Sequence, residues 1–419
     1  MSRSPVWHPF TQHGLEPDML AIARAEGAWL ETADGRRIFD GVSSWWVITH
    51  GHRHPKIVRA IQEQAGKLDQ VIFAGFTHEP AEAVARGLIA LAPPGFGHVF
   101  FSDSGSTSVE VALKMALGYW KNIGKPRTRI LALEHAYHGD TIGTMSAGAR
   151  GVFKPAYEPL LFDVGRIPFP AAGAEQTTFD ALERACRAGD VAAFICEPLI
   201  LGAGGMLIYD AATLAEMHRI CKRHDVLLIA DEVMTAFGRT GTLFASEQAK
   251  IAPDIICVAK GITGGSIPLA ATLCTEAIFD AHYSQDRSRM FFHSSSYTAN
   301  PIACAAAAAN LDIWRSEAVL SRIDAVSKAQ SACLAQIAND PRFENTRQIG
   351  TIAAFELRGA SAGYLADVAL ALRRKLLDRN VLLRPLGATI YVMPPYCATA
   401  DDLNGVYAAI FEVADEVRR

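Results

Sequence analysis

The chain has 419 residues, 50% of them hydrophobic and 20% charged, and its formal net charge at pH 7 is −4. This length allows two to three domains, and this charge balance excludes a basic protein built to bind nucleic acid or an anionic membrane. The 8 cysteines never form a C-x-x-C motif, which is typical of reduced thiols in a cytosolic protein. We expect a cytoplasmic protein, because residues 1–14 lack the apolar stretch of a secretory signal and no run reaches the roughly 20 apolar residues of a membrane span.

In chain order, the first predicted element is a hairpin in which residues 28–32 and 36–39 flank the turn Ala33-Asp34-Gly35. Helical and strand patterns then alternate up to about residue 280. Helices are predicted at 56–69, 79–92, 107–123, 178–188 and 211–224, the fourth capped within residues 177–180. Strands are predicted at 98–102, 129–133, 191–196, 226–230, 255–259 and 269–275. Because these strands are continuously apolar, we expect an α/β fold with a mostly parallel sheet buried on both faces.

After residue 301 the pattern changes to a smaller α+β domain. Helices are predicted at 302–315, 318–338, 363–379 and 401–418, and strands at 352–356, 381–383 and 389–392. The sequence therefore predicts a large domain (51–300) and a small C-terminal domain (301–419), preceded by an N-terminal segment (1–50) that packs with the small domain and with the ligand site.

Lys260 is the most informative single residue. It follows the apolar strand 255–259 and precedes the glycine-rich turn 261–265. Burial at such a position disfavours the ammonium form, so a nucleophilic amine that can form a Schiff base becomes available near neutral pH. Asp231 ends the strand 226–230 in the same way. An aspartate that keeps a pyridine nitrogen protonated and a lysine that holds an aldehyde are the pair that pyridoxal phosphate requires.

Two further segments fit such a site, although each also has an ordinary explanation. Small residues at 103–107, including Gly105 and Ser106, lead from a strand into a helix and are able to seat a phosphate on backbone amides. The same residues are also consistent with a plain Ser/Thr helix cap. Tyr137 follows another strand and is able to lie on a planar ring, although a loop tyrosine usually only packs. Together with Lys260 and Asp231, the two segments favour a cofactor site.

Two other signals are discounted. His50, His52 and His54 alternate like metal ligands, but Gly51 and Pro55 indicate a turn and no cysteine or carboxylate stands at ligand spacing, so we predict no metal site. The run Gly202-Ala203-Gly204-Gly205 lacks the third glycine and the downstream acid of a dinucleotide fingerprint. We interpret it as a loop that approaches the cofactor.

Over essentially its whole length the chain resembles the class III (subgroup II) pyridoxal-phosphate aminotransferases. The elements that carry this resemblance are Asp231-Glu232-Val233, Phe237-Gly238-Arg239-Thr240-Gly241, Pro253-Asp254-Ile255 and Lys260 followed by Gly264-Gly265. More selective elements are Trp7-His8-Pro9-Phe10-Thr11, Ser43-Ser44-Trp45-Trp46, Tyr137-His138-Gly139-Asp140, Arg384-Pro385 and Tyr391-Val392-Met393-Pro394-Pro395-Tyr396. They are similar to family members of biotin biosynthesis. The resemblance implies a fold-type I transferase that moves an amino group from S-adenosylmethionine to 8-amino-7-oxononanoate, giving 7,8-diaminononanoate.

The resemblance also implies roles for individual residues at the cofactor. Lys260 would be the Schiff-base lysine and proton carrier, and Asp231 would bind the pyridine nitrogen. Val233 and Tyr137 would face opposite sides of the ring, while Gly105 and Ser106 would seat the phosphate.

For the substrate, the resemblance implies a pocket lined by Phe10, Trp45, Tyr137, Lys260, Ser294 and Arg384. Arg384 would pair with a carboxylate through its planar fork, and the aromatic walls would suit a sulfonium donor. Ser295 and Ser296 would reach the phosphate of a neighbouring subunit, which implies a homodimer with shared active sites.

The chain departs from the family pattern at two places. Phe10 stands where some members have tyrosine, and residues 294–296 are three serines where some members have Gly-Pro-Thr. The lost hydroxyl at Phe10 leaves the amino donor open. Two alternatives therefore remain: an ω-amino acid or diamine:pyruvate transaminase of the same family, and a non-catalytic relative kept as a ligand sensor or assembly subunit.

Overall fold

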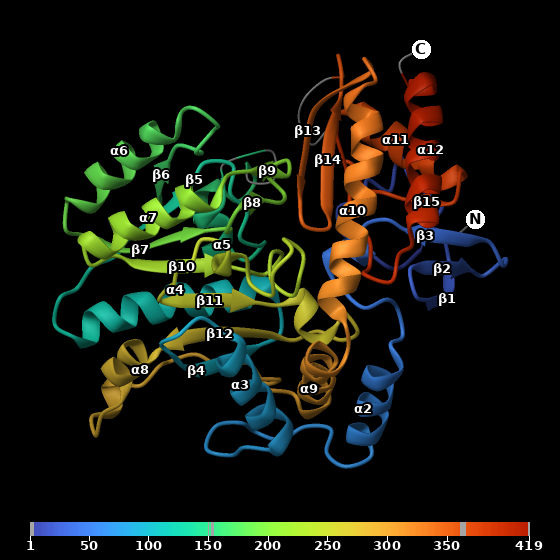
Figure 1. Cartoon of the computed structure of the whole chain (residues 1–419). Coiled ribbons are helices and arrows are strands. Elements are labelled where there is room, and N and C mark those ends of the chain that lie inside the picture. The colour runs from blue at the N-terminus through green and yellow to red at the C-terminus, as the bar shows by residue number, and fades with distance from the viewer. Residues whose placement is uncertain (1–3, 150, 152–154, 361–365, 418–419) are drawn as a thin grey trace.

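The computed structural model describes residues 4–149, 151, 155–360 and 366–417 (Figure 1). Its centre is a seven-stranded sheet with the order β4-β12-β11-β10-β7-β5-β6. These strands are β4 (Phe96–Ser102), β5 (Arg129–Leu133), β6 (Gly165–Ile167), β7 (Val191–Cys196), β10 (Leu227–Asp231), β11 (Ile255–Val258) and β12 (Ala270–Thr275). Strands β6, β5, β7, β10 and β11 are parallel neighbours, whereas β12 runs antiparallel to both β11 and β4. The predicted α/β class with a mostly parallel sheet is therefore confirmed.

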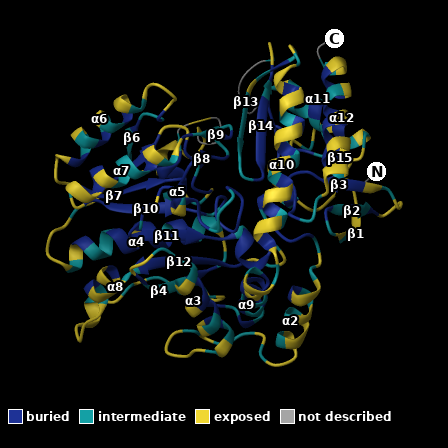
Figure 2. Ribbon diagram, viewed as in Figure 1, coloured by how far each residue is buried: buried dark blue, intermediate teal, exposed yellow. Residues whose placement is uncertain are grey.

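Successive side chains of a strand point to opposite faces of a sheet, so alternate residues of these strands pack into two different hydrophobic cores. Leu131 and Leu133 of β5 pack with the helices α6 and α7 on one face. Ile130 and Ala132 of the same strand pack with α4 on the other face. Figure 2 shows the central strands β7, β10 and β11 as buried, and every residue of these three strands is buried. A strand covered on both faces has no need of polar residues, which explains the continuous apolar runs in the sequence.

The helices of this part surround the sheet. They are α2 (Pro55–Ala65), α3 (Glu79–Leu91), α4 (Gly105–Asn122), α5 (Ile142–Ala147), α6 (Glu175–Cys186), α7 (Ala211–Arg223) and α8 (Glu276–His282). Short 3₁₀ helices within the described residues are η1 (Glu158–Leu160), η2 (Ala245–Glu247), η3 (Lys260–Thr263) and η4 (Arg287–Arg289). The predicted cap at 177–180 is wrong: α6 begins at Glu175, and Thr178 lies inside it, where its hydroxyl donates to the carbonyl of Pro168 at 3.0 Å. Serine and threonine bond the backbone inside helices as well as at caps, so the residue type alone did not fix the position.

The C-terminal part and the N-terminal strands lie together at one side of the large sheet (Figure 1). Its helices are α9 (Pro301–Ser316), α10 (Val319–Ala338), α11 (Asp367–Asp378) and α12 (Ala400–Val417). A three-stranded antiparallel sheet is made of β13 (Phe343–Ile349), β14 (Ile352–Leu357) and β16 (Thr389–Val392). The predicted helices 363–379 and 401–418 correspond to α11 and α12, and residues 363–365 and 418 lie outside the described residues.

A second sheet joins the two ends of the chain. It has the order β1-β2-β3-β15, from β1 (Ile22–Glu26), β2 (Trp29–Thr32), β3 (Arg37–Asp40) and β15 (Val381–Leu382). The predicted hairpin is the antiparallel pair β2 and β3, and β15 pairs with β3 in parallel. A two-stranded ribbon, β8 (Ile200–Leu201) and β9 (Leu207–Ile208), carries the glycine-rich loop 202–205 at its turn.

The helix α9 packs into the apolar core beside the large sheet, through Ala303, Cys304, Ala307 and Leu311. The helix α10 packs instead with β14, β16 and α12. The division of the chain at residues 50 and 300 stays a prediction. Among the described residues, no helix combines the length and the apolar character that crossing a membrane would require.

Candidate active site

A cavity of about 360 Å³ opens at the carboxyl ends of the strands of the large sheet, where ligands gather in open α/β folds. Six residues predicted from the sequence line it: Gly105, Ser106, Tyr137, Asp231, Val233 and Lys260. The residues that line it without having been assigned a role are Trp46, Val47, Asp103, Ser104, His138, Gly139, Glu197, Met234, Ala259 and residues 265–269. The structure thus brings together predicted residues that are up to 155 positions apart in the chain, as Gly105 and Lys260 are.

Lys260 lies just beyond β11, as the first residue of η3, with a backbone φ of 47°. This left-handed conformation costs a non-glycine residue about 1–2 kcal/mol, and such strain is concentrated at functional sites. Its Nζ atom lies 5.3 Å from the centre of the Trp46 ring. Burial lowers the pKa of Lys260 from its ordinary value, while the carboxylates of Asp231 and Glu197 act in the opposite direction. Lowering this pKa raises the fraction of nucleophilic amine.

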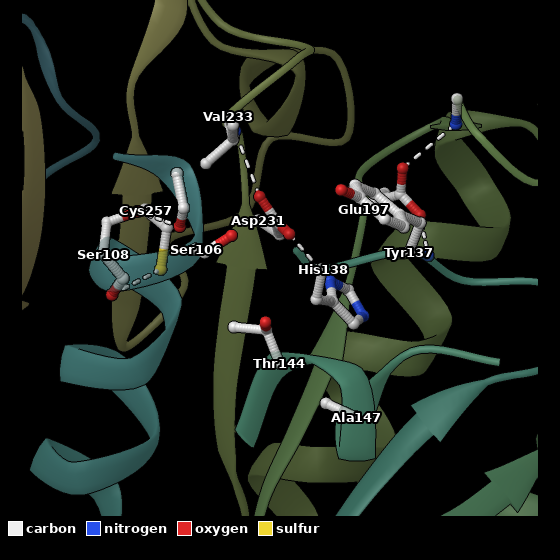
Figure 3. Close-up of polar contacts among 12 residues, drawn as sticks. Ser106, Ser108, Tyr137, His138, Thr144, Ala147, Glu197, Asp231, Val233 and Cys257 are labelled. Atoms are coloured by element: carbon white, nitrogen blue, oxygen red, sulfur yellow. Dashed lines mark hydrogen bonds and ion pairs between the residues drawn. The ribbon is translucent and has the colours of Figure 1, made fainter. Parts of the chain in front are cut away.

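Asp231 is the last residue of β10, and its carboxylate is held from two sides (Figure 3). Oδ1 accepts a hydrogen bond from the backbone amide of Val233 at 3.1 Å. His138 Nδ1 lies 2.7 Å from Oδ2 and donates to it, because a carboxylate only accepts. The His138 side chain is fully buried, so it fixes the direction of the carboxylate toward the cavity. His138 belongs to the motif Tyr137-His138-Gly139-Asp140, from which no role was predicted for it.

The N-terminus of α4 offers a seat for an anion. Ser104 caps this helix through its hydroxyl, which accepts from the amide of Thr107, while Gly105 and Ser106 form the first turn and line the cavity. The helix cap is therefore Ser104, and the phosphate seat at Gly105 and Ser106 stays a prediction. A Cβ atom on Gly105 would lie 2.6 Å from Cγ1 of Val233, and one on Gly139 would overlap Ser106. These close approaches explain why glycine stands at both positions.

Glu197 is a residue of the cavity wall that the sequence did not single out. It follows β7 as Asp231 ends β10, and its side chain points into the same cavity (Figure 3). Its carboxylate accepts from the amides of Tyr137 and Gly202, each at 3.0 Å, and so joins two loops of the site. Burial, followed by the charge of Asp231, raises the pKa of Glu197 to about 8. A carboxylate directly after a predicted buried strand was the available signal.

Tyr137 is half-buried beside Glu197. Burial raises the pKa of its hydroxyl, and the charge of Asp140 acts in the same direction, so the phenol stays protonated. The loop 202–205, predicted to approach the cofactor, is bound to Glu197 through Gly202, and a Cβ on Gly202 would collide with Met234 of the cavity wall.

The predicted substrate residues Phe10, Trp45 and Arg384 form a separate cluster. The Arg384 guanidinium lies 4.5 Å above the Trp45 ring, and the Phe10 ring centre lies 5.6 Å from that of Trp45. Arg384 also donates to the carbonyl of Phe10 at 3.1 Å. None of the three lines the 360 Å³ cavity.

The turn α1 (Ser43–Trp46) connects this cluster to the cavity. All four of its residues have positive φ, between 45° and 74°, so the turn is left-handed. Trp46 lines the cavity beside Lys260, and its neighbour Trp45 meets Arg384. The carbonyl of Trp46 accepts from the buried guanidinium of Arg239, which also binds the carbonyls of Ile48 and Pro394.

The serines 294–296 lie beside the cavity rather than in it. Ser295 donates from its hydroxyl to Asp103 Oδ2 at 3.2 Å, and Asp103 lines the cavity. Ser294 and Ser296 are exposed. Within one chain, residues 294–296 do not line the cavity that contains Gly105 and Ser106.

The three histidines that alternate near residue 52 each have a different partner. His50 Nε2 lies 2.8 Å from Asn310 Oδ1, His52 Nε2 lies 2.9 Å from Asp40 Oδ2, and His54 Nε2 lies 3.5 Å from Glu317 Oε1. Throughout the part of the chain that the structure describes, no three histidine, cysteine or acidic side chains converge as metal ligands would.

The cavity fits pyridoxal phosphate in the chemistry of its groups. The amine of Lys260 suits the aldehyde, the oriented carboxylate of Asp231 suits the ring nitrogen, and the first turn of α4 suits the phosphate. Val233 and Tyr137 supply an aliphatic and an aromatic surface for the ring. An α/β fold that places these groups around one cavity defines a pyridoxal-phosphate-dependent enzyme.

Comparison with known proteins narrows this class. The family described as "Aminotransferase class-III" matches residues 10–413. A relative from Synechococcus elongatus named adenosylmethionine-8-amino-7-oxononanoate aminotransferase is 47% identical over an alignment of 425 positions, which covers 99% of this chain and 100% of its own. A crystal structure of an enzyme with that name from Methanocaldococcus jannaschii has a TM-score of 0.94 at 32% identity, covering 98% and 97% of the two chains. A PLP-bound amine transaminase from an uncultivated Pseudomonas species has a TM-score of 0.92 at 32% identity, covering 99% of each chain.

The chain belongs to the class III aminotransferases. It is therefore an aminotransferase that depends on pyridoxal phosphate, and the family, fold class and cofactor predicted from the sequence are confirmed.

Proposed function

We propose that this aminotransferase moves an amino group from S-adenosylmethionine to 8-amino-7-oxononanoate and forms 7,8-diaminononanoate, a step of biotin biosynthesis. The observation that carries the proposal is the cluster of Arg384, Trp45 and Phe10 beside the Lys260 cavity. It offers a cation for a terminal carboxylate and aromatic surface for the apolar chain behind it. The names of the relatives from Synechococcus elongatus and Methanocaldococcus jannaschii support the same substrates.

The cofactor, when bound, stabilises negative charge on the carbon that loses a proton during the transfer. The protein's own residues do the rest. Lys260 would hold the aldehyde, and its amine, once free, would carry a proton to and from the substrate carbon. Asp231, oriented by His138, keeps the ring nitrogen protonated. Gly105 and Ser106 bind the phosphate, and Val233 and Tyr137 enclose the ring.

Arg384 binds the carboxylate of the oxo acid, and Phe10, Trp45, Tyr137 and Ser294 line the path between this cation and Lys260. The positive charge of a sulfonium donor is attracted to the faces of aromatic rings, and the paired indoles of Trp45 and Trp46 supply two of them. Because two different substrates use one site in turn, ping-pong kinetics are expected.

The proposed active form is a cytoplasmic homodimer. Ser295 and Ser296 would complete the phosphate seat of the partner, which is consistent with the exposure of this segment at the rim of the cavity. Exposed apolar side chains of the neighbouring segments, Ile72, Phe76, Phe292 and Tyr297, offer the surface that such a dimer would bury.

The other class III candidate is an ω-amino acid or diamine:pyruvate transaminase, and Phe10 is the residue that favours it. A hydroxyl at this position would be available to the amine substrate, and Phe10 lacks it. The solved amine transaminase at 32% identity keeps this candidate open.

The visible absorption of the protein purified with pyridoxal phosphate tests the proposal. Addition of S-adenosylmethionine alone should remove the band of the lysine-bound cofactor, and 8-amino-7-oxononanoate should then restore it. A band that is present but unmoved by S-adenosylmethionine would contradict the donor, and alanine, lysine and diamines would then be tried. Absence of any band after adding pyridoxal phosphate would contradict the catalytic role of Lys260.

A further inference from the structure

Asn310 of α9 holds the turn that carries Lys260, although it lies 50 residues further along the chain. Its amide nitrogen donates to the carbonyls of Gly261 and Ile262, both at 3.0 Å. Its amide oxygen lies 2.8 Å from His50 Nε2. Both side chains are buried. A single amide therefore connects the N-terminal segment to the two residues that follow Lys260.

The chemistry of the partners fixes the orientation of each group. Carbonyls only accept, so the nitrogen of Asn310 must face Gly261 and Ile262, and its oxygen must accept from His50. His50 consequently carries its proton on Nε2. Burial lowers the pKa of His50 to about 4, so the ring stays neutral and keeps this form throughout the neutral range.

The turn after Lys260 needs such support because the sheet does not provide it. The ladder of β11 ends at Val258, two residues before the lysine. Lys260 then takes a left-handed φ of 47°, and Gly264 and Gly265 follow at 66° and 88°. A strained turn persists only when its surroundings over-determine it.

The N-terminal segment closes the turn from the other side. A Cβ on Gly265 would lie 2.5 Å from the backbone of Val47, and the amide of Thr49 donates to the carbonyl of Gly264 at 3.4 Å. His50 extends this contact to Asn310, since it follows Thr49 directly. The segment that was discounted as a metal site therefore lies against the lysine turn.

We propose that His50 and Asn310 are positioning residues for Lys260: the histidine orients the asparagine amide, and the amide fixes the turn that aims the lysine at the cofactor aldehyde. The inference rests on the proposed role of Lys260 and is independent of which amine is the donor. A misplacement of about 1 Å at a reacting group costs on the order of 100-fold in rate.

Gln330 offers a matched control in α10. It is also fully buried, its amide nitrogen donates to the carbonyls of Thr351 and Val392 at 3.2 and 3.0 Å, and its oxygen accepts from the hydroxyl of Tyr407 at 2.7 Å. It thus makes the same number of hydrogen bonds as Asn310, but it belongs to α10, which does not line the Lys260 cavity. Asn310→Ala and Gln330→Ala each leave two buried carbonyls without their donor and should lower stability similarly.

The experiment follows the rate at which the cofactor-free protein forms its visible band after mixing with pyridoxal phosphate. Asn310→Ala should slow this attachment about 10- to 100-fold, and Gln330→Ala should leave the rate within about 2-fold. His50→Leu should slow it less than Asn310→Ala, because the two bonds to the turn remain. His50→Gln, which keeps a donor, should recover most of the rate.

Hydrogen exchange gives a second readout that does not require the cofactor. Amides of residues 261–265 should exchange faster in Asn310→Ala and His50→Leu than in Gln330→Ala, even if Asn310→Ala is poorly folded. Attachment at the wild-type rate in Asn310→Ala, or an equal loss in the Gln330→Ala control, would overturn the proposal. Failure of the donor assignment would appear separately, as an attached cofactor that does not respond to S-adenosylmethionine.

Discussion

The floor of the site, with Asp231 and Lys260, and its rim, with Phe10, Trp45 and Arg384, are built in different ways. Asp231 at the floor is 4% exposed, and each of its oxygens has a fixed partner. Phe10 and Trp45 at the rim are 43% and 36% exposed and contact mainly each other and Arg384. The floor is formed by strand ends of one sheet, whereas the rim comes from the N-terminal segment and the loop after β15. In the proposed function, the chemistry belongs to the buried part and the choice of substrate to the exposed part.

The largest expected effect concerns the floor. Lys260→Ala should abolish turnover, with a loss of at least about 10²–10⁴-fold, because no other amine in the cavity is available to carry the proton. The protein should still bind pyridoxal phosphate through the remaining groups. Steady-state transamination and the absorption of the bound cofactor check this. Activity within 10-fold of the wild type would break the assignment of Lys260.

Arg384→Met tests the rim. The change keeps the length of the side chain and removes its charge, so kcat/KM for 8-amino-7-oxononanoate should fall about 10- to 100-fold, since hydrogen bonds to a charged group contribute about 1.5–3 kcal/mol. The half-reaction with the donor should change much less. Arg358→Met, at an exposed arginine beyond β14, serves as the control. An equal loss in both half-reactions would show that Arg384 does not discriminate between the substrates.

Glu197→Gln sharpens the comparison through pH. The pKa of Glu197 is raised to about 8 in the folded protein, from an ordinary value of 4.5. The folded state therefore binds a proton that the unfolded state releases between these values, so the contribution of this group to stability falls as pH rises from about 4.5 to 8. In cofactor-free protein, the free energy of unfolding should fall less over this range for Glu197→Gln than for the wild type. The difference should be a few kcal/mol at most, at about 1.4 kcal/mol per pKa unit. Urea unfolding at several pH values measures the difference, and parallel curves would contradict it.

Phe10→Tyr is expected to have the smallest effect. One added hydroxyl contributes about 0.5–1.5 kcal/mol, which corresponds to a change of about 2- to 12-fold in kcat/KM. The change should appear in one half-reaction only, and the half-reaction affected identifies the substrate that meets this residue. Phe279→Tyr, at an exposed phenylalanine of α8, is the control.

The floor was largely predictable from the sequence because its residues end strands whose apolar runs are unmistakable. Lys260 and Asp231 each follow such a run directly, and the parallel sheet brings their ends together. Glu197 has the same relation to β7, but a glutamate after a strand is also a common surface residue, and its burial only becomes visible in the fold. The partnership of His50 with Asn310 joins positions 260 residues apart, and no local pattern encodes it.

The rim was predictable only through the family resemblance. The left-handed turn of Ser43–Trp46 separates the directions of two adjacent tryptophans, and no propensity rule anticipates four consecutive non-glycine residues with positive φ. The cap predicted at 177–180 was wrong although a common capping pattern was present. Thr178 uses its hydroxyl for a hydrogen bond to the carbonyl of Pro168 instead.

The pairing of β3 with β15 also determines when the enzyme is able to complete its folding during synthesis. Phe39 of β3 pairs with Val381 of β15, so this pair forms only after residue 381 has been synthesised. A ribosome needs roughly 20–70 s to add the intervening residues. The turn with Trp45 and Trp46 lies shortly after β3. Arg239 donates hydrogen bonds to the carbonyl of Trp46 and to that of Pro394. A nascent chain is thus able to form the large sheet before the C-terminal part is synthesised. The cluster of Phe10, Trp45 and Arg384 forms only when translation is almost complete.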